Sequence, residues 1–274
     1  AKKLKEDIYL VGEIWDRNSV ILPYYEAISA FDFQMSESGG RVASTARGVD
    51  SVNSYVKYLN NYKNSVKEIR SDAILQPFIS NHDQNRAAGY LNVDSGLMHI
   101  AANLYILTYG TPFIYYGEEI GMKGVRGNEN TDANRRLAML WGDKDKVLDP
   151  IGSTFDKKLQ TNGTVKSQIG DKNSLYNHYK KLIMIRNAYP QIARGEYTPL
   201  EFDGYYNFGG FLTTYNGKTL AVFHNTMDVA VEVNLNKFAD VTFKRILSYV
   251  GIGSAILDGQ VLTLDGYTSV IIEL

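Results

Sequence analysis

The sequence predicts an α/β domain made of parallel β/α units, followed by a smaller all-β domain. Short apolar segments alternate with longer amphipathic segments through most of the 274 residues, which is the pattern of parallel β/α units. After Pro190 the pattern changes to short strands separated by turn pairs such as Asn-Gly and Asp-Gly. We therefore expect the α/β domain at residues 1–192 and an antiparallel β domain at residues 193–274.

Four short apolar segments are expected to form the parallel strands. They cover residues 8–12, 30–34, 74–80 and 112–116. Apolar side chains at helical spacing predict three longer helices, over residues 49–69, 95–108 and 174–188. Residues 122–164, rich in Gly, Asn, Asp and Lys, are expected to form a long irregular excursion, and such loops usually carry function in a β/α scaffold.

The second domain is expected to hold antiparallel strands and no catalytic residue. Four segments beyond about Tyr197 have the residue types of strands, and they read GFLTTYN, TLAVFHN, VAVEVNL and SVIIEL.

The composition argues against some classes of binding partner and favours others. The net charge is −1, from 29 basic and 30 acidic residues, so nothing points to nucleic acid or an anionic membrane, and a neutral substrate is favoured. The 20 tyrosines suit sugar binding, although core packing explains most of them. The absence of cysteine excludes disulfides and thiolate metal sites.

No membrane span is expected, and the cellular location is not readable from the first residues. His99, Asn103, Gly110 and Pro112 interrupt the longest apolar stretch, residues 96–116, which reads better as a buried helix, a turn and a strand. The opening AKKLKEDIYL has no initiator methionine and no apolar run of a secretory signal, as expected for an internal or processed start.

Carboxylates follow two of the expected strands. Glu13 ends the first strand in YLVGEIWD, and Asp83 ends the third in PFISNHDQNR. Active sites of parallel β/α folds lie at the carboxyl ends of strands, and glycosidic bond cleavage requires a pair of carboxylates there. Apolar neighbours of Glu13 would disfavour its ionised form if they are buried, which suits a proton donor. The alternative is that Glu13 only closes a strand and pairs with a lysine.

His82, beside Asp83, supplies a donor for sugar hydroxyls. A His-Asp pair is also found in metal sites and in turns, but no other histidine or aspartate stands at ligand spacing, so we expect no metal in this chain.

The chain resembles the α-amylase family of retaining glycoside hydrolases. YLVGEIWD and FISNHDQNR resemble two of its sequence blocks, and TPFIYYGEEIGM resembles its last barrel strand. NRRLAMLWGD resembles the Arg-x-Pro-Met-x-Trp segment of some oligosaccharide-cleaving members, with Ala138 in the place of Pro. NSLYNHYKKLIMIRNAYP resembles the final barrel helix before the family's β-sandwich. The resemblance covers nearly the whole chain and implies the second half of a (β/α)8 TIM barrel followed by a C-terminal antiparallel β-sandwich.

The resemblance also implies the roles of the site residues. Glu13 matches the general acid/base, and Asp83 matches the carboxylate that holds substrate hydroxyls and stabilises the transition state. His82 matches the histidine that hydrogen-bonds the sugar. Trp15 would be a stacking platform near the leaving group or a packing residue, and Arg86 would contact substrate or hold its loop in a salt bridge. Glu118 and Glu119 match an acidic pair that is more often structural in the family.

Parts of the family pattern are missing. We find neither the Gly-x-Arg-x-Asp block that holds the nucleophile nor the Asn-His block after the third barrel strand, and the residues before Pro190 are too few for a barrel of ~250 residues. The resemblance therefore implies the C-terminal half of an enzyme, inactive alone, that acts on an α-glucan and pairs with an N-terminal barrel half, with a second copy of this chain as the less favoured alternative. Alone, this half is expected to leave open two strand edges and an inner apolar face made by residues such as Leu10, Phe33, Phe78 and Ile114. The resemblance also implies calcium in the missing N-terminal half and an extracellular bacterial location.

Two alternatives remain open on the sequence. One is a carbohydrate-binding or scaffolding relative without catalysis, which the missing nucleophile would suit. The other is a transglycosylase or isomerase, which would share these carboxylates and differ in its loops.

Overall fold

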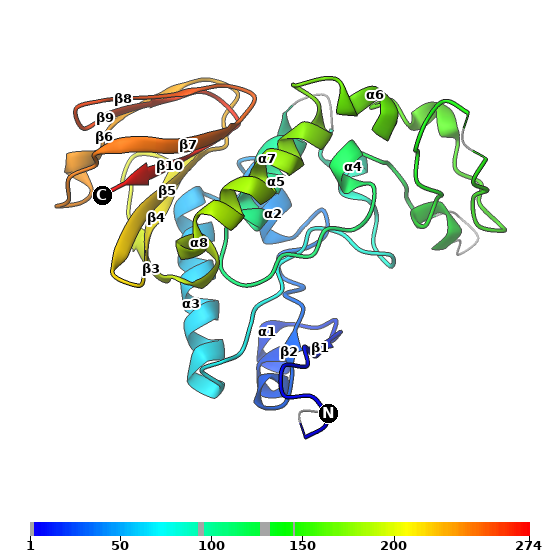
Figure 1. Cartoon of the computed structure of the whole chain (residues 1–274), viewed down its shortest axis with the longest axis horizontal. Helices are drawn as coiled ribbons and strands as arrows, with labels where there is room; N and C mark the ends of the chain where they lie inside the picture. Colours follow the sequence, from blue (N-terminus) through cyan, green and yellow to red (C-terminus); the bar gives the residue numbers. More distant parts are fainter. Residues whose placement is uncertain (1–2, 93–95, 127–131, 145) are drawn as a thin grey trace.

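The chain forms an open set of parallel strands and helices packed against a β-sandwich (Figure 1). The structure is a computed structural model that describes residues 3–92, 96–126, 132–144 and 146–274. Helices α5 and α7 lie between the sandwich and the long loops, and the N-terminal segment with β1 and β2 extends away from both (Figure 1).

Four extended segments pair in parallel, in sequence order. Strand β1 (Val11–Gly12) pairs with β2 (Ser29–Ala30), and the bridge between Phe31 and Gln76 joins the third segment. The third and fourth segments are joined by N–H donation from Thr111 to the Leu75 carbonyl at 2.8 Å and from Phe113 to the Pro77 carbonyl at 2.9 Å.

These strands are shorter than the sequence predicted, and residues 112–116 have no assigned strand. Pro77 falls inside the third segment and has no N–H to donate to the fourth, so the ladder between these two segments is interrupted there.

The three long helices are confirmed to within a few residues. Ser51 and Ser174 begin two of them, because each hydroxyl accepts from the backbone N–H three residues later. Ser95, the expected first residue of the third, lies outside the described residues. The helices are α1 (Asn18–Ile21), α2 (Arg41–Ala46), α3 (Val52–Ile69), α4 (Ala87–Tyr90), α5 (Leu97–Ile106), α6 (Val165–Ile169), α7 (Leu175–Ala188) and α8 (Pro190–Arg194).

Short 3-10 helices mark the remaining turns. They are η1 (Leu22–Glu26), η3 (Glu118–Ile120), η4 (Asp132–Arg135), η5 (Lys157–Leu159) and η6 (Leu235–Lys237). In the described part of residues 122–164, η4 and η5 are the helical turns, so the expected irregular excursion is confirmed there. Leu137 anchors this excursion by packing with Met122 and Val165 in a small apolar cluster.

The C-terminal part is a sandwich of two antiparallel sheets, in the order β3-β4-β5-β10-β7 and β6-β9-β8. The strands are β3 (Glu196–Leu200), β4 (Phe208–Tyr215), β5 (Lys218–Asn225), β6 (Val231–Asn234), β7 (Arg245–Gly251), β8 (Ala255–Asp258), β9 (Val261–Leu264) and β10 (Thr268–Glu273). The four segments predicted from sequence lie in β4, β5, β6 and β10.

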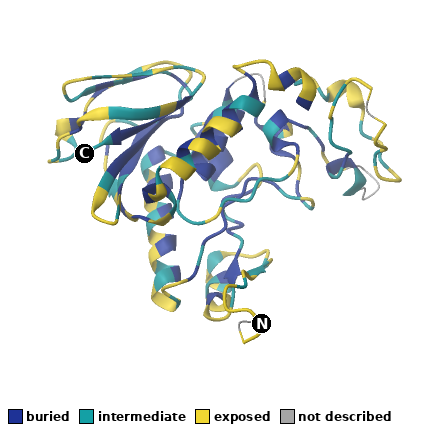
Figure 2. Ribbon diagram, in the orientation of Figure 1, coloured by how far each residue is buried: buried dark blue, intermediate teal, exposed yellow. Residues whose placement is uncertain are grey.

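The five-stranded sheet is buried on both faces. Alternate residues of β5 and β10 point to opposite sides, so Val222 and Ile271 join the core that contains α3, α5 and α7, whereas Phe223 and Val270 join the core between the two sheets. Figure 2 shows the buried residues concentrated in this sheet and in the helices that cover it. The predicted boundary at 192/193 stays a prediction, since one apolar core runs across it.

Among the described residues, no helix combines the length and the apolar character needed to cross a bilayer.

Candidate active site

Glu13, His82 and Asp83 meet at one end of the parallel segments. One side-chain ligand atom from each of the three lies within 4.8 Å of the others. Glu13 directly follows β1, and His82 and Asp83 follow the third segment, so the shared parallel direction brings them to the same edge. The predicted proximity of Glu13 and Asp83 is therefore confirmed, while their chemical roles stay predictions.

Asn81 organises this group, although the sequence analysis assigned it no role. Its Oδ1 accepts the backbone N–H of Asp83 at 2.9 Å, and its Nδ2 donates to Glu13 Oε1 at 3.5 Å. His82 Nε2 lies 3.3 Å from Asp83 Oδ2. A single short loop thus orients both carboxylates.

Arg136 is a second residue that sequence reasoning left without a role. Its Nη2 donates to Asp83 Oδ1 at 2.6 Å, and its Nε donates to the His82 carbonyl at 3.1 Å. Arg135 donates to the Asp83 carbonyl, and both arginines donate to Asp132. The NRRLAMLWGD segment was the available signal, but its sequence does not show which side chain it meets.

The same three side chains are close enough together to hold a metal ion. Arg136 places a guanidinium on Asp83 Oδ1 at 2.6 Å, and this fixed positive charge opposes a cation at the same carboxylate. The donor set therefore fits a site for sugar hydroxyls better than a metal site, and the predicted absence of a metal stays a prediction.

Glu13 is not enclosed by apolar groups in this structure. Its side chain is exposed, and the neighbouring Tyr9, Leu10 and Trp15 are 45%, 37% and 52% exposed. The condition under which apolar neighbours would disfavour the ionised form of Glu13, their burial, is therefore not met in this chain.

The inner face of the parallel segments is better covered than the sequence analysis expected. Of the residues expected to be left open there, Phe33 and Phe78 are only 6% and 2% exposed. Their rings meet edge to face at 5.1 Å, and each also contacts Phe31. Leu10 is the exposed member of the set, and Ile114 is partly buried.

Trp15 stacks on Phe33, with the ring centroids 5.3 Å apart and the planes 15° apart. It is 52% exposed, so this packing leaves part of the indole accessible. Both suggested roles, a platform for a sugar and a packing residue, therefore remain compatible with its position.

Arg86 lies away from solvent, with 0% exposure. Its Nη1 donates to the Tyr116 carbonyl at 2.6 Å and its Nε to the Arg135 carbonyl at 2.9 Å, while its guanidinium lies over the Tyr115 and Tyr116 rings. These contacts support the loop-holding alternative, through carbonyls and rings instead of the expected salt bridge. They give no support to a substrate contact.

Two buried carboxyl groups lie behind the site. Burial raises the pKa of Glu118 to about 8, against the lowering effect of hydrogen bonds from Ser80 and Tyr105. Burial likewise raises the pKa of Asp32 to about 7, although Tyr58 donates to both of its oxygens. Asp32 follows β2 and Phe31, and no role for it was predicted from sequence.

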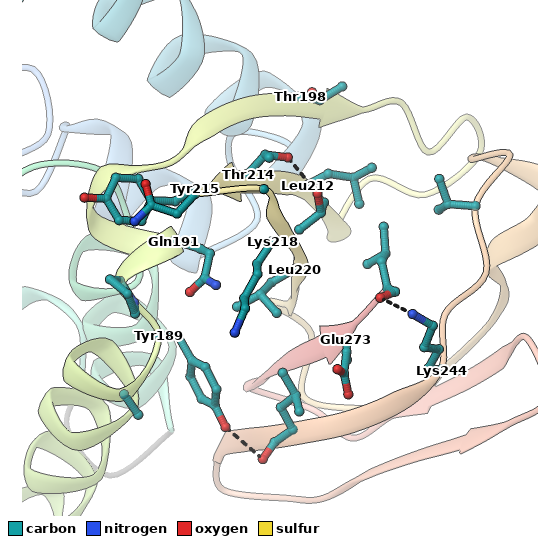
Figure 3. Close-up of a pocket in the computed structure, with 18 of the residues that line it drawn as sticks. Tyr189, Gln191, Thr198, Leu212, Thr214, Tyr215, Lys218, Leu220, Lys244 and Glu273 are labelled. Carbon is teal, nitrogen blue, oxygen red and sulfur yellow. Dashed lines mark hydrogen bonds between the residues drawn. The ribbon is translucent and has the colours of Figure 1, made fainter.

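A large cavity lies away from this site. It has a volume of about 1120 Å³ and lies between the end of α7, α8 and the turn that joins β4 to β5 (Figure 3). Tyr189, Gln191 and Lys218 line it, whereas Glu13, His82 and Asp83 do not. Cavity size therefore does not locate the chemistry, and the clustered carboxylates are the better guide.

The family model that matches this chain and the two relatives named below are all alpha-amylases. The model of the alpha-amylase catalytic domain matches residues 1–195. "Alpha-amylase SusG" of Bacteroides thetaiotaomicron is 30% identical over 281 aligned positions, which cover 98% of this chain and 39% of SusG. "Alpha-amylase 3" of Dictyoglomus thermophilum is 29% identical, with 100% of this chain and 52% of that protein covered. The chain thus spans about half or less of the length of these curated relatives.

Solved structures agree. "Eubacterium rectale Amy13B" superposes with a TM-score of 0.89 at 30% identity, covering 99% of this chain and 54% of that structure. An alpha-amylase from H. orenii gives a TM-score of 0.79 at 27% identity, with 99% and 54% covered. The parallel segments described above are the second half of a (β/α)8 barrel, and the sandwich is its C-terminal β domain. The family match over residues 1–195 shows that this chain belongs to the alpha-amylase family.

Proposed function

We propose that the protein containing this chain hydrolyses α-glucosidic bonds in starch-like glucans with retention of configuration, and that this chain supplies the proton donor. The observation that carries the proposal is the cluster of Glu13, His82 and Asp83 within 4.8 Å, at the strand ends of an alpha-amylase family chain.

In this mechanism Glu13 donates its proton to the leaving glycosidic oxygen as the bond to the anomeric carbon breaks. A carboxylate from outside residues 1–274 forms the covalent glycosyl ester on the opposite face of the sugar. Glu13 then removes a proton from water, which attacks the anomeric carbon and releases the nucleophile. Asp83, held by Arg136 at 2.6 Å, accepts hydrogen bonds from sugar hydroxyls, and His82 donates to another.

The function is tested on the full-length protein with starch, maltotriose and isomaltose as substrates. We expect hydrolysis of at least one α-glucan, with the α-anomer as the first product in proton NMR. Transfer products without free glucose would favour a transglycosylase or isomerase. Binding of glucan without turnover would favour a scaffolding relative, and either result would overturn the hydrolase assignment.

A complementary N-terminal barrel half is the proposed partner. The outer edges of β1 and of residues 112–116 have no neighbouring strand among the described residues, and Tyr9, Leu10 and Tyr116 are 45%, 37% and 39% exposed beside them. Unpaired edges and exposed apolar side chains favour a covering chain. Residues 1–274 alone are expected to be inactive on an α-linked aryl maltoside and to become active when the separately produced N-terminal half is added. Turnover by a monodisperse lone chain would contradict this.

Two further expectations from the family remain proposals. Calcium would be bound by the complementary half, so chelation is expected to lower the thermal stability of the full-length protein more than that of residues 1–274. An extracellular location is expected and is tested by assaying the culture medium against the cell lysate of the source bacterium.

A further inference from the structure

Glu118 places a buried carboxyl next to the strand end that carries the candidate site. It follows Gly117, whose φ of +86° starts the turn into η3. Glu119 accepts the Gly117 backbone N–H at 2.8 Å, whereas Glu118 is directed inward and is only 2% exposed. The two adjacent acids therefore have different environments, and only Glu118 reaches the interior.

Glu118 joins two elements. Its Oε1 accepts the Ser80 hydroxyl at 2.6 Å, and its Oε2 accepts the Tyr105 hydroxyl at 3.0 Å. Ser80 is the last residue of the third parallel segment, and Tyr105 belongs to α5. Both donors are buried, at 2% and 0% exposure. Loss of the carboxyl would leave two buried hydroxyls without this acceptor, which costs about 1 to 3 kcal/mol for each group.

Ser80 directly precedes the loop that carries the site. Asn81, the next residue, accepts from the Asp83 N–H and donates to Glu13, as described above. On the other side of Ser80, the Ile79 carbonyl accepts the Tyr90 hydroxyl at 3.0 Å. The strand end is therefore anchored from two sides, and the anchor nearer to the site is the bond to Glu118.

We propose that Glu118 is a positioning residue: by accepting the Ser80 hydroxyl it fixes the strand end from which Asn81, His82 and Asp83 reach the substrate. The inference rests on the proposed hydrolase function. Displacement of catalytic groups by about 1 Å can lower turnover ~100-fold, so a small shift at Ser80 is enough to be measured.

The test compares variants of the full-length protein on an α-glucan. Ser80→Ala and Glu118→Ala are each expected to lower kcat by about 10-fold or more with a smaller change in KM, because orientation is lost more than affinity. The double variant is expected to have about the same kcat as Glu118→Ala alone, since both single substitutions remove the same Ser80–Glu118 hydrogen bond. Glu118→Gln keeps an amide oxygen for the Ser80 hydroxyl and should recover most of the kcat.

Tyr105→Phe is the matched control. It removes the other hydrogen bond of the same carboxyl but leaves Ser80 in place, so kcat should stay within about 2-fold of wild type even if the melting temperature falls. Equal loss of kcat in Tyr105→Phe and Ser80→Ala would overturn the proposal, as would additive effects of the two alanine substitutions or a Glu118→Gln variant as inactive as Glu118→Ala.

A second measurement does not depend on hydrolysis. The imidazole of His82, assigned by its loss in His82→Ala, is followed by NMR, and its chemical shifts are expected to change in Ser80→Ala but not in Tyr105→Phe. Unchanged His82 shifts in Ser80→Ala would overturn the positioning role. If wild type lacks hydrolase activity but the His82 shifts behave as expected, the proposed function fails and the positioning role stands.

Discussion

The two regions of the molecule, before and after residue 196, differ in the charged side chains that they bury. Before residue 196, the described residues bury five charged side chains, which are Asp32, Lys63, Arg86, Glu118 and Arg135. Residues 196–274, all of which the structure describes, bury none, and their polar interior consists of Thr, Ser and Asn side chains with His224. Burial of charge opposes folding unless the groups are paired. The barrel half therefore holds buried charges that need partners, such as Lys63 with Glu196, whereas the sandwich interior is built from apolar and uncharged polar groups.

Strand pairing shows the same contrast. In the sandwich, β4 and β5 pair over eight residues each, whereas β1 and β2 in the barrel half contain two residues each. The helices of the barrel half pack on the sandwich sheet through a shared core. Substitutions in the first region should therefore alter chemistry, and substitutions in the second should alter stability.

The largest effect is expected at Glu13. Glu13→Gln in the full-length protein removes the proton donor and leaves His82 and Asp83 in place, so kcat should fall by about 100- to 10,000-fold with little change in KM. Steady-state kinetics measure this, with Glu26→Gln as the control at another exposed glutamate of the same region. Unchanged kcat would show that another acid donates the proton.

The counterpart in the sandwich is Phe223. It is 0% exposed and its ring contacts those of Phe202, Phe208 and Phe243. Phe223→Ala should lower the free energy of unfolding by about 3 to 5 kcal/mol, and kcat per folded molecule should not change. Denaturant titration measures the free energy of unfolding, and active-site titration gives kcat per folded molecule. Ile256→Ala, at a position 62% exposed, is the control and should shift stability by about 0.5 kcal/mol or less.

A smaller effect is expected from the buried carboxyl of Asp32. Its pKa rises from 3.8 to about 7 on folding because of burial, so the folded state binds more protons than the unfolded state between these values. Its contribution to stability is therefore fully present below pH ~4 and is lost as the pH rises to ~7.

Asp32→Asn should remove the decrease in the free energy of unfolding that accompanies ionisation of Asp32. At pH 8 the variant should therefore be more stable than wild type by on the order of 1 to 3 kcal/mol. Melting temperatures measured from pH 4 to pH 8 test it, with the exposed Asp203→Asn in the sandwich region as the control. An Asp32→Asn variant with the same pH profile as wild type would show that Asp32 is ionised in the folded protein without penalty.

The smallest effect is expected at Trp15. Loss of an aromatic platform costs about 0.5 to 1.5 kcal/mol, so Trp15→Ala should raise KM by roughly 2- to 10-fold while kcat changes less. The control is Tyr24→Ala, at a ring that is 49% exposed in the same region. A loss of thermal stability with no change in KM would assign Trp15 to packing on Phe33.

The proximity of Glu13 and Asp83 could be predicted from the sequence because the carboxyl ends of parallel strands share one edge of the sheet. This rule needs no knowledge of side-chain packing. The contact between Arg136 and Asp83 could not be predicted, because Arg136 lies 53 residues beyond Asp83 in the chain and an irregular loop brings the two together. The burial of Asp32 was also missed, since a carboxyl after a strand resembles any exposed loop residue.

The fold shows the same limit. Strands β3, β7, β8 and β9 were not among the four segments named from sequence, and in β7 and β8 most residues are partly or fully exposed, so an unbroken apolar run is lacking. The length of the third parallel strand was overestimated because Pro77 was read as part of an apolar run and not as a break in the hydrogen-bond ladder.

If residues 1–274 carry the acid/base and not the nucleophile, the glycosyl ester must form on a carboxylate outside them, and trapping this ester shows where it forms. In 5-fluoro-α-glucosyl fluoride, the ring fluorine slows both steps and the fluoride leaving group favours the first, so the ester accumulates. We expect peptide mass mapping of the inactivated full-length protein to place the label on a carboxylate outside residues 1–274, in wild type and in Glu13→Gln alike. A label on Asp83, or on any residue of this chain, would contradict the account.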